Sequence, residues 1–294
     1  MNKSMKLRAF LYGLLLFLQS ALVLTGGAVR VTGSGLGCPT WPECTPGSYT
    51  PVPNQAEGQL HAWIEFGNRL LTFALVLSAL AVLIHVMKTG RKDLRSLALG
   101  QVLGIFGQGI LGGITVLTDL HPLPVAGHLL LSIVLIAGAA SLFSRRNSPA
   151  RERVGVEKLE SRVSRLHITL TFSVIFLGTL VTGSGPHAGD EKAQRFGFDI
   201  RTIAWIHADA VIALLGLTAA LYILVRNNQV LRRKVAIFTA VALSQGAIGY
   251  IQYFTGIPEI LVIAHLLGAV LVWITAWQIR IATIKEIIPN PDRG

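Results

Sequence analysis

The chain has 294 residues, of which 52% are hydrophobic and only 14% are charged. With a mean hydropathy of +0.58, this composition excludes an ordinary soluble two-domain enzyme and is typical of a polytopic membrane protein. The formal net charge of +11 would favour a nucleic-acid partner for a soluble protein, but in a membrane protein the basic residues are first sorted by membrane side.

Eight apolar stretches, each of the length that a helix needs to cross a bilayer, follow one another along the chain. They cover residues 8–30, 60–87, 95–118, 122–144, 166–184, 201–225, 235–254 and 258–281. Of the 26 Lys and Arg residues, 21 lie at the N-terminus, in alternate loops or in the C-terminal tail. This asymmetry predicts a multi-pass protein of the cell membrane with both termini cytoplasmic, surrounded by lipid and with no nucleic-acid partner.

The third and fourth spans recur as the seventh and eighth. Residues 108–130 align without a gap with residues 245–267, and nine of these 23 positions are identical. The pentapeptide VTGSG occurs after the first span and again after the fifth, which argues against cleavage of the first span as a signal peptide. Because each half has four spans, both halves insert the same way round as a parallel repeat.

We therefore expect an all-α integral membrane protein whose eight transmembrane helices form two four-helix bundles. The N-terminal half is predicted at 1–146 and the C-terminal half at 166–294, joined by a charged cytoplasmic linker at 147–165.

The only two cysteines, Cys38 and Cys44, lie in the first outer loop, within TGSGLGCPTWPECTPGS. The outer compartment is oxidising, so a disulfide that closes this loop is expected. A structural staple and a redox-active dithiol both remain open. A zinc site is not favoured, because only two thiols are available and the loop contains no histidine.

Four of the eight histidines lie within the outer ends of the even-numbered spans. They are His61, His128, His207 and His265. Any one alone is explained as a hydrogen-bonded core residue, but together they bring a ligand-capable side chain to one depth on each even helix. A porphyrin iron held between two helices requires that arrangement. The other four are expected at cytoplasmic helix ends (His85, His167) or solvated in outer loops (His121, His187), with no cofactor role.

In the second span, His61, Glu65 and Asn68 are spaced by four and three residues and share one helix face, with Arg69 directly after them. The third and seventh spans carry several glycines, which allow either close helix packing or room for a flat macrocycle. These are Gly104, Gly107, Gly109, Gly112, Gly113, Gly246 and Gly249.

The outer-loop and histidine motifs together resemble a known family. The first half reads GGAVRVTGSGLGCPTWPEC and then HAWIEFGNRLL, and the second half contains VTGSG, AWIHADA and IAHLL. From residue 26 to about 277 the chain resembles haem A synthase, in an actinobacterial-like bacterial form. In that family a membrane enzyme converts haem O to haem A for cytochrome oxidase. The resemblance implies that the N-terminal half takes the substrate haem and the C-terminal half holds haem b.

Carried over by position, the resemblance implies that His207 and His265 are the axial ligands of the haem b iron. It makes His128 a ligand of the substrate haem iron and Glu65 the catalytic acidic residue. The sequence departs from the family at Asn68, where the family more often has a histidine beside the arginine.

An asparagine is a poor axial ligand. Either His61 replaces the missing ligand, with the haem nearer the surface, or the substrate iron keeps an open site. Asn68 and Arg69 would then line the substrate haem without ligating its iron.

The implied reaction is oxidation of the C8 methyl group of haem O to a formyl group, by successive hydroxylation and loss of water. Glu65 would handle protons or stabilise a cationic intermediate. Arg30 and Arg69 either pair with haem propionates or are charges that snorkel to the outer interface. Haem O synthase and an electron donor that the sequence does not identify are the expected partners.

Two other functions remain. A dihaem b-type electron-transfer protein would explain the four histidines, but not Glu65 or the cysteine loop. A transporter would explain the parallel repeat and would bind no haem.

Overall fold

The structure is a computed structural model that describes residues 3–147 and 159–284. It contains eight α-helices, α1 (Lys3–Val31), α2 (Gln59–Lys88), α3 (Lys92–Leu117), α4 (Pro122–Arg145), α5 (Leu159–Ser184), α6 (Ile200–Leu224), α7 (Gln229–Phe254) and α8 (Glu259–Thr283). All eight are long and apolar enough to cross a membrane, and the described residues contain no β-strand beyond one isolated bridge. The all-α membrane fold and its eight spans are confirmed.

Local sequence signals account for several of the helix ends. Gly33 takes a left-handed φ of +67° just after α1, a conformation that glycine adopts without steric cost. The carboxylate of Asp199 accepts a hydrogen bond from the Thr202 amide at 2.8 Å and caps α6. Hydrogen bonds from Thr202 hold the pKa of that carboxyl below its usual value. The side chain of His121 accepts from the Leu123 amide at the start of α4.

The fifth helix begins earlier than the sequence predicted. The expected span was 166–184, whereas α5 starts at Leu159, so residues 159–165 of the expected linker are helical. Residues 148–158 of that linker lie outside the described part of the chain. The first turns of α5 carry Arg162 and Arg165, which lower their hydropathy although they continue the helix.

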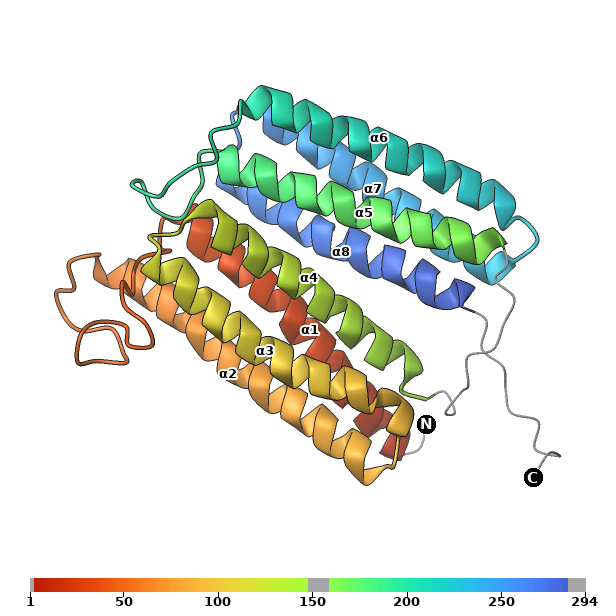
Figure 1. The fold of residues 1–294 in the computed structure, drawn as a ribbon, viewed down its shortest axis with the longest axis horizontal. Coiled ribbons are helices and arrows are strands. Elements are labelled where there is room, and N and C mark those ends of the chain that lie inside the picture. Colours follow the sequence, from red (N-terminus) through yellow and green to blue (C-terminus); the bar gives the residue numbers. More distant parts are fainter. Residues whose placement is uncertain (1–2, 148–158, 285–294) are drawn as a thin grey trace.

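The eight helices pack as two groups of four (Figure 1). Within the first group α1 contacts α2 and α4, and α3 contacts α2 and α4. The second group repeats this pattern with α5 to α8, and the two groups meet where α8 packs on α1 and α4 and where α4 packs on α5. The histidine-bearing helices α2 and α4, and likewise α6 and α8, therefore lie diagonally across their bundles. No Cα pair between the described residues of either diagonal comes within 8 Å.

The apolar core of each bundle lies toward the end opposite the first outer loop. In the second bundle, the buried residues of α7 are Leu231, Val235, Phe238 and Ala242, and α6 has none between Ile203 and Leu214. The outer half of that bundle, the half nearer the first outer loop, therefore contains few of the buried apolar side chains of α6 and α7. His207 and His265 both lie in this outer half.

Side-chain hydrogen bonds join the two bundles across α4 and α8. The indole N–H of Trp273 donates to the Ile133 carbonyl at 2.7 Å. The indole N–H of Trp277 donates to the Ser141 hydroxyl, also at 2.7 Å. Such bonds satisfy polar groups that have no water available in a bilayer.

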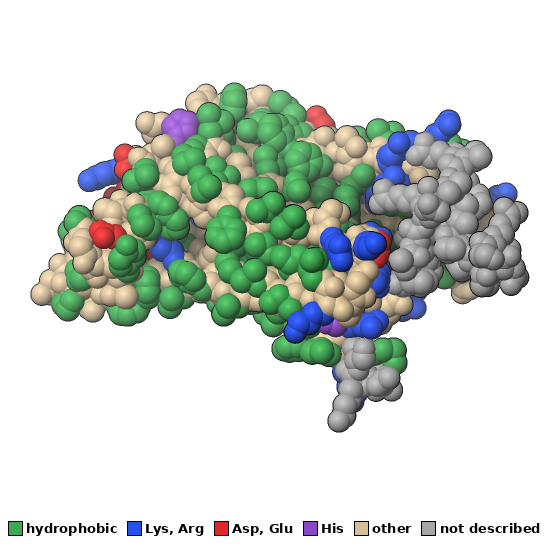
Figure 2. Space-filling view, turned by 60° about the horizontal axis from the view of Figure 1, so that its bottom comes forward, with side chains coloured by type: hydrophobic (Ala, Val, Ile, Leu, Met, Phe, Trp, Pro, Cys, Tyr) green, Lys and Arg blue, Asp and Glu red, His purple; other side chains and the backbone are tan. Residues whose placement is uncertain are grey.

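Figure 2 shows hydrophobic side chains over the middle of the molecule and most of the visible Lys and Arg side chains toward one end. This is the distribution expected for a membrane-spanning protein. At that end Asp93 accepts hydrogen bonds from Arg91 at 2.8 Å and from Arg145 at 3.0 Å, which ties the start of α3 to the end of α4.

Two histidine placements differ from the sequence expectation. His167 is fully buried rather than interfacial. Its Nε2 bonds to Thr218 at 3.0 Å, and its ring meets Phe238 edge to face. The early start of α5 explains the error, because it places His167 two turns inside the helix. His187 is not simply solvated either, because its ring nitrogen bonds to the Ile257 carbonyl at 2.8 Å.

Candidate functional site

The first outer loop, residues 32–58, folds back over the end of α2 and is closed by a disulfide between Cys38 and Cys44. Both cysteines are fully buried, and the Cys44 amide donates to the Ser48 carbonyl at 2.9 Å. The side-chain amide of Gln55 donates to the Gly37 carbonyl. The expected disulfide is thus present, within a loop that has its own hydrogen bonds.

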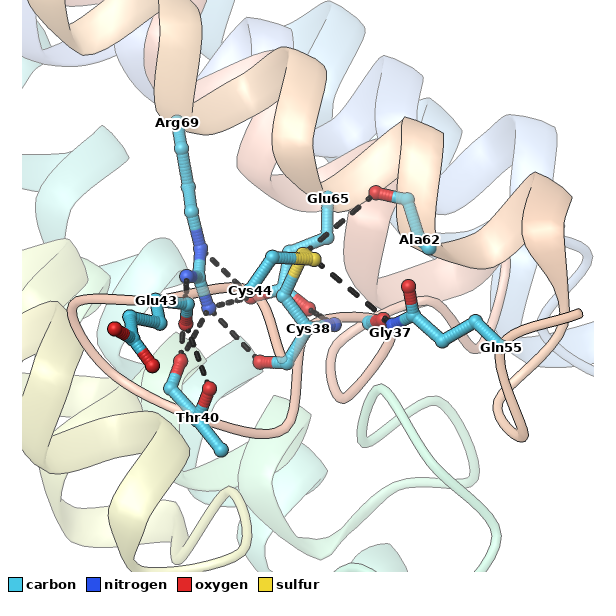
Figure 3. A network of polar contacts seen from close by, with 9 residues as sticks. All are labelled: Gly37, Cys38, Thr40, Glu43, Cys44, Gln55, Ala62, Glu65 and Arg69. Carbon is cyan, nitrogen blue, oxygen red and sulfur yellow. Dashed lines mark hydrogen bonds and ion pairs between the residues drawn. A yellow bond between two sulfur atoms is a disulfide. The ribbon is translucent and has the colours of Figure 1, made fainter. Parts of the chain in front are cut away.

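Glu65 lies beneath this loop and is only 6% exposed. One carboxylate oxygen is 2.6 Å from a terminal nitrogen of Arg69, and the other accepts from the Cys38 amide at 2.7 Å. The two contacts fix the orientation of the carboxyl group and connect it to the disulfide (Figure 3). The sequence predicted the spacing of Glu65 and Arg69, but not that the loop covers them.

Arg69 of α2 holds the first outer loop through hydrogen bonds to its backbone. Its terminal nitrogens donate to the carbonyls of Cys38 at 2.9 Å, Glu43 at 3.2 Å and Thr40 at 3.2 Å, as Figure 3 shows. Because the guanidinium also donates to Glu65, its donors are directed at protein acceptors. The geometry therefore pairs Arg69 with groups of the protein and not with a haem propionate.

Trp41 extends the loop from α2 to α3. The Arg69 guanidinium stacks over the Trp41 ring at 5.3 Å, and a methyl group placed on Gly113 of α3 would come within 2.5 Å of that ring. The neighbouring Gly112 faces His128 instead, since a methyl group there would lie 3.2 Å from His128 Nε2. Successive glycines of α3 thus accommodate the loop tryptophan and the α4 histidine.

His61 and Asn68 already have partners on and after α1. His61 Nδ1 lies 2.9 Å from the Ser34 hydroxyl, and the Asn68 carbonyl oxygen accepts from the Thr25 hydroxyl at 2.7 Å. The shared helix face predicted from the sequence is therefore present, but it points toward α1 and the loop.

In the second bundle, His207 is oriented by the backbone. Its Nδ1 donates to the Val174 carbonyl of α5 at 3.0 Å, which leaves Nε2 with the lone pair that a metal needs. A methyl group on Gly178 would lie 3.4 Å from the His207 ring, and one on Gly249 would lie 3.4 Å from the His265 ring. Each imidazole thus packs close to a glycine of a neighbouring helix.

These residues fit a haem better than any metal held by side chains alone. His207 and His265 lie in the same half of their bundle, and His265 Nδ1 is buried without a partner. Among the described residues, no group of three or more His, Cys, Asp or Glu could hold a metal ion. Two imidazoles suffice for iron when a porphyrin supplies the in-plane ligands.

No role was predicted from the sequence for Gln108 and Gln245, the first residues of the two aligned segments. In the structure the side-chain amide of Gln108 donates to the His128 carbonyl at 3.1 Å and to the Ser132 hydroxyl at 2.7 Å. A signal was available, because in each repeat a polar residue inside an apolar span precedes the histidine by 20 positions.

Fold and site together define a polytopic membrane protein with two histidine-bearing four-helix bundles and a disulfide-closed outer loop. Residues 9–277 match the COX15-CtaA family of cytochrome oxidase assembly proteins. The chain belongs to that family.

Several curated relatives are similar. A protein named heme A synthase from Methylobacterium radiotolerans is 34% identical over 229 residues, covering 64% of this chain and 59% of the relative. One from Azorhizobium caulinodans is 26% identical over 310 residues, covering 87% and 88%. In three further relatives of that name, from Geobacillus kaustophilus, Geobacillus thermodenitrificans and a Methylobacterium strain, the match spans 26%, 35% and 56% of the relative's length.

Proposed function

We propose that this chain is a haem A synthase, an oxidoreductase that converts the C8 methyl group of haem O to a formyl group and so supplies haem A to cytochrome oxidase. The observation that carries the proposal is the contrast between the two bundles. One presents a pair of histidines, and the other adds to its histidine a buried carboxylate held by Arg69 under the disulfide loop. The relatives' name points the same way.

The C-terminal bundle is proposed to hold haem b, with His207 and His265 as the residues that would bind its iron. When bound, haem b supplies one-electron transfer. The chain's own contribution is orientation, because the Val174 carbonyl fixes the His207 ring and Gly249 packs close to the His265 ring.

The N-terminal bundle is proposed to bind haem O as substrate, with His128 as the protein ligand of its iron. The existing partners of His61 and Asn68, which are Ser34 and Thr25, support an open position opposite His128 rather than a second histidine. An open position suits a centre at which chemistry occurs. Trp41 and the loop above it would limit access of water to that centre.

Glu65 is proposed to act on the reacting methyl group. Each of the two hydroxylations inserts one oxygen atom into a C–H bond and takes two electrons from the methyl carbon, so an external oxidant must accept them; loss of one water from the resulting diol then gives the formyl group. A carboxylate held at a fixed position in a water-poor site can stabilise positive charge at the carbon or handle the protons released. Arg69 and the Cys38 amide keep the Glu65 carboxyl group in one orientation for either role.

We further propose that the protein lies in the cell membrane with both termini cytoplasmic, receives haem O from a haem O synthase, and draws electrons from a separate donor. The basic residues at one end of the bundles support this orientation. A simple dihaem electron carrier or a transporter would leave the Glu65–Arg69 contact and the loop without a role.

The test is product formation. The gene is expressed beside a haem O synthase in a host that lacks haem A, and the membrane haems are extracted and chromatographed. Haem A is expected to appear only when both proteins are present. Accumulation of haem O with no haem A, at a normal protein level, would contradict the proposal.

A further inference from the structure

Two buried polar atoms without partners lie on the facing surfaces of α7 and α8. They are the side-chain oxygen of Gln245 and Nδ1 of His265. Gln245 packs against Gly268, one turn beyond His265 on α8, because a methyl group on Gly268 would overlap the Gln245 amide. One turn farther along α7, a methyl group placed on Gly249 would lie 3.4 Å from Cε1 and 3.9 Å from Nδ1 of the His265 ring. Gln245 and Nδ1 thus share one small region.

The equivalent glutamine in the first bundle is used differently. Gln108 donates its amide hydrogens to the His128 carbonyl and the Ser132 hydroxyl. The position that corresponds to Ser132 in the second repeat is Ala269, which has no hydroxyl. Gln245 therefore lacks the hydroxyl partner of Gln108, and its side-chain oxygen, like that of Gln108, is buried without a hydrogen-bond partner.

A hydrogen-bond donor and an acceptor that are buried without partners in a low-dielectric site each destabilise the protein, and a hydrogen bond between them removes both costs. A histidine that binds a metal through Nε2 carries its proton on Nδ1. In nearly all such sites that N–H donates to a carbonyl, a carboxylate or water, which fixes the ring and strengthens the ligand. His207 already has such an acceptor in the Val174 carbonyl. His265 has none among its present contacts.

We propose that Gln245 is the positioning residue of the haem b centre. Its side-chain carbonyl accepts the hydrogen bond from Nδ1–H of His265, leaving Nε2 for the iron. This inference rests on the proposed function, because it requires haem b in the C-terminal bundle. The two equivalent glutamines of the repeat then act differently. Gln245 bonds to the ring of His265, whereas Gln108 bonds to the backbone carbonyl of His128.

Hydrogen bonding to Nδ1–H makes the imidazole a stronger donor and so stabilises ferric iron. Gln245→Met keeps the length of the side chain and removes the carbonyl, so the haem b reduction potential should rise. The reduced-to-oxidised ratio at a fixed ambient potential should increase by about threefold to tenfold, where tenfold corresponds to 59 mV for a one-electron couple. The matched control is Gln108→Met at the repeat-equivalent position, which should leave the haem b potential unchanged.

The measurement is a spectroscopic redox titration of haem b in the purified holoprotein, with the low-spin ferric spectrum recorded beside it. Gln245→Asn keeps a carboxamide on a shorter side chain and should raise the haem b reduction potential by less. This variant replaces Gln245→Met as the test if Gln245→Met retains no haem. A haem b reduction potential equal to that of the wild type in Gln245→Met would overturn the inference and leave the proposed function intact. If Gln245→Met retains no haem, the same result in Gln245→Asn would overturn it. A wild-type protein that binds no haem b would instead refute the proposed function.

Discussion

Replacing Glu65 by glutamine should nearly abolish haem A formation while leaving haem b in place. The substitution keeps the shape of the side chain and an oxygen that can accept from the Cys38 amide, now 2.7 Å away. It removes the negative charge that lies 2.6 Å from Arg69. Loss of one preorganised electrostatic group costs about 100- to 1000-fold in turnover, or about 2.7–4 kcal/mol. Because the group acts mainly as the methyl carbon is oxidised, substrate binding should change much less.

The structural cost of this substitution should be smaller than its catalytic cost. Arg69 retains its hydrogen bonds to the loop carbonyls of Cys38, Thr40 and Glu43, and these carbonyl dipoles continue to stabilise its positive charge. We expect a loss of about 1–3 kcal/mol from the buried pair, which leaves the bundle folded and the haem b spectrum normal.

The assay compares membrane haems from cells that express wild-type protein, Glu65→Gln or Glu43→Gln beside haem O synthase. Glu43 is the matched control, because it is a carboxylate of the same loop that bonds to a backbone amide, Gly47 N at 2.9 Å, outside the Glu65–Arg69 pair. Haem A should fall sharply only in Glu65→Gln, with haem O or a hydroxylated intermediate accumulating. Near-normal haem A from Glu65→Gln would show that the carboxylate is not needed for the reaction.

Three further predictions follow from named contacts. Replacing either His207 or His265 by alanine should weaken haem b binding and remove the low-spin haem b spectrum, because the iron loses one of its two protein ligands; an unchanged spectrum in both variants would exclude this ligation. Cys38 and Cys44 should resist alkylation in intact protein and react only after reduction, so labelling of either thiol without reductant would contradict the disulfide. Asn68→Ala should still make haem A at a rate within about tenfold of wild type, because its side chain bonds to α1; loss of all product would show that Asn68 has a direct role.

Hydropathy was sufficient for the number of spans but not for every boundary. The start of α5 was placed seven residues too late, because its first turns carry arginines that mark the membrane edge without ending the helix. That boundary error also led to the wrong environment for His167, which packs against Thr218 and Phe238 inside the second bundle.

Periodicity predicted which residues share a helix face but not what that face meets. Glu65 and Asn68 lie on one side of α2, yet one bonds to the outer loop and the other to α1. The loop that covers Glu65 precedes it by about 27 positions, so no local pattern reveals the contact. The duplication predicted that Gly112 and Gly249 are equivalent, and both do face a histidine of the next helix.

The haem content of point variants tests the central claim, that the two bundles hold different haems, most directly. Wild-type protein, His128→Ala and His265→Ala are purified from cells that make haem O, and the extracted haems are separated by chromatography. Wild-type protein should contain haem b together with haem O or haem A. His265→Ala should lose haem b and retain the other, whereas His128→Ala should lose haem O and haem A and retain haem b. Loss of the same haem in both variants would contradict the assignment of one haem to each half.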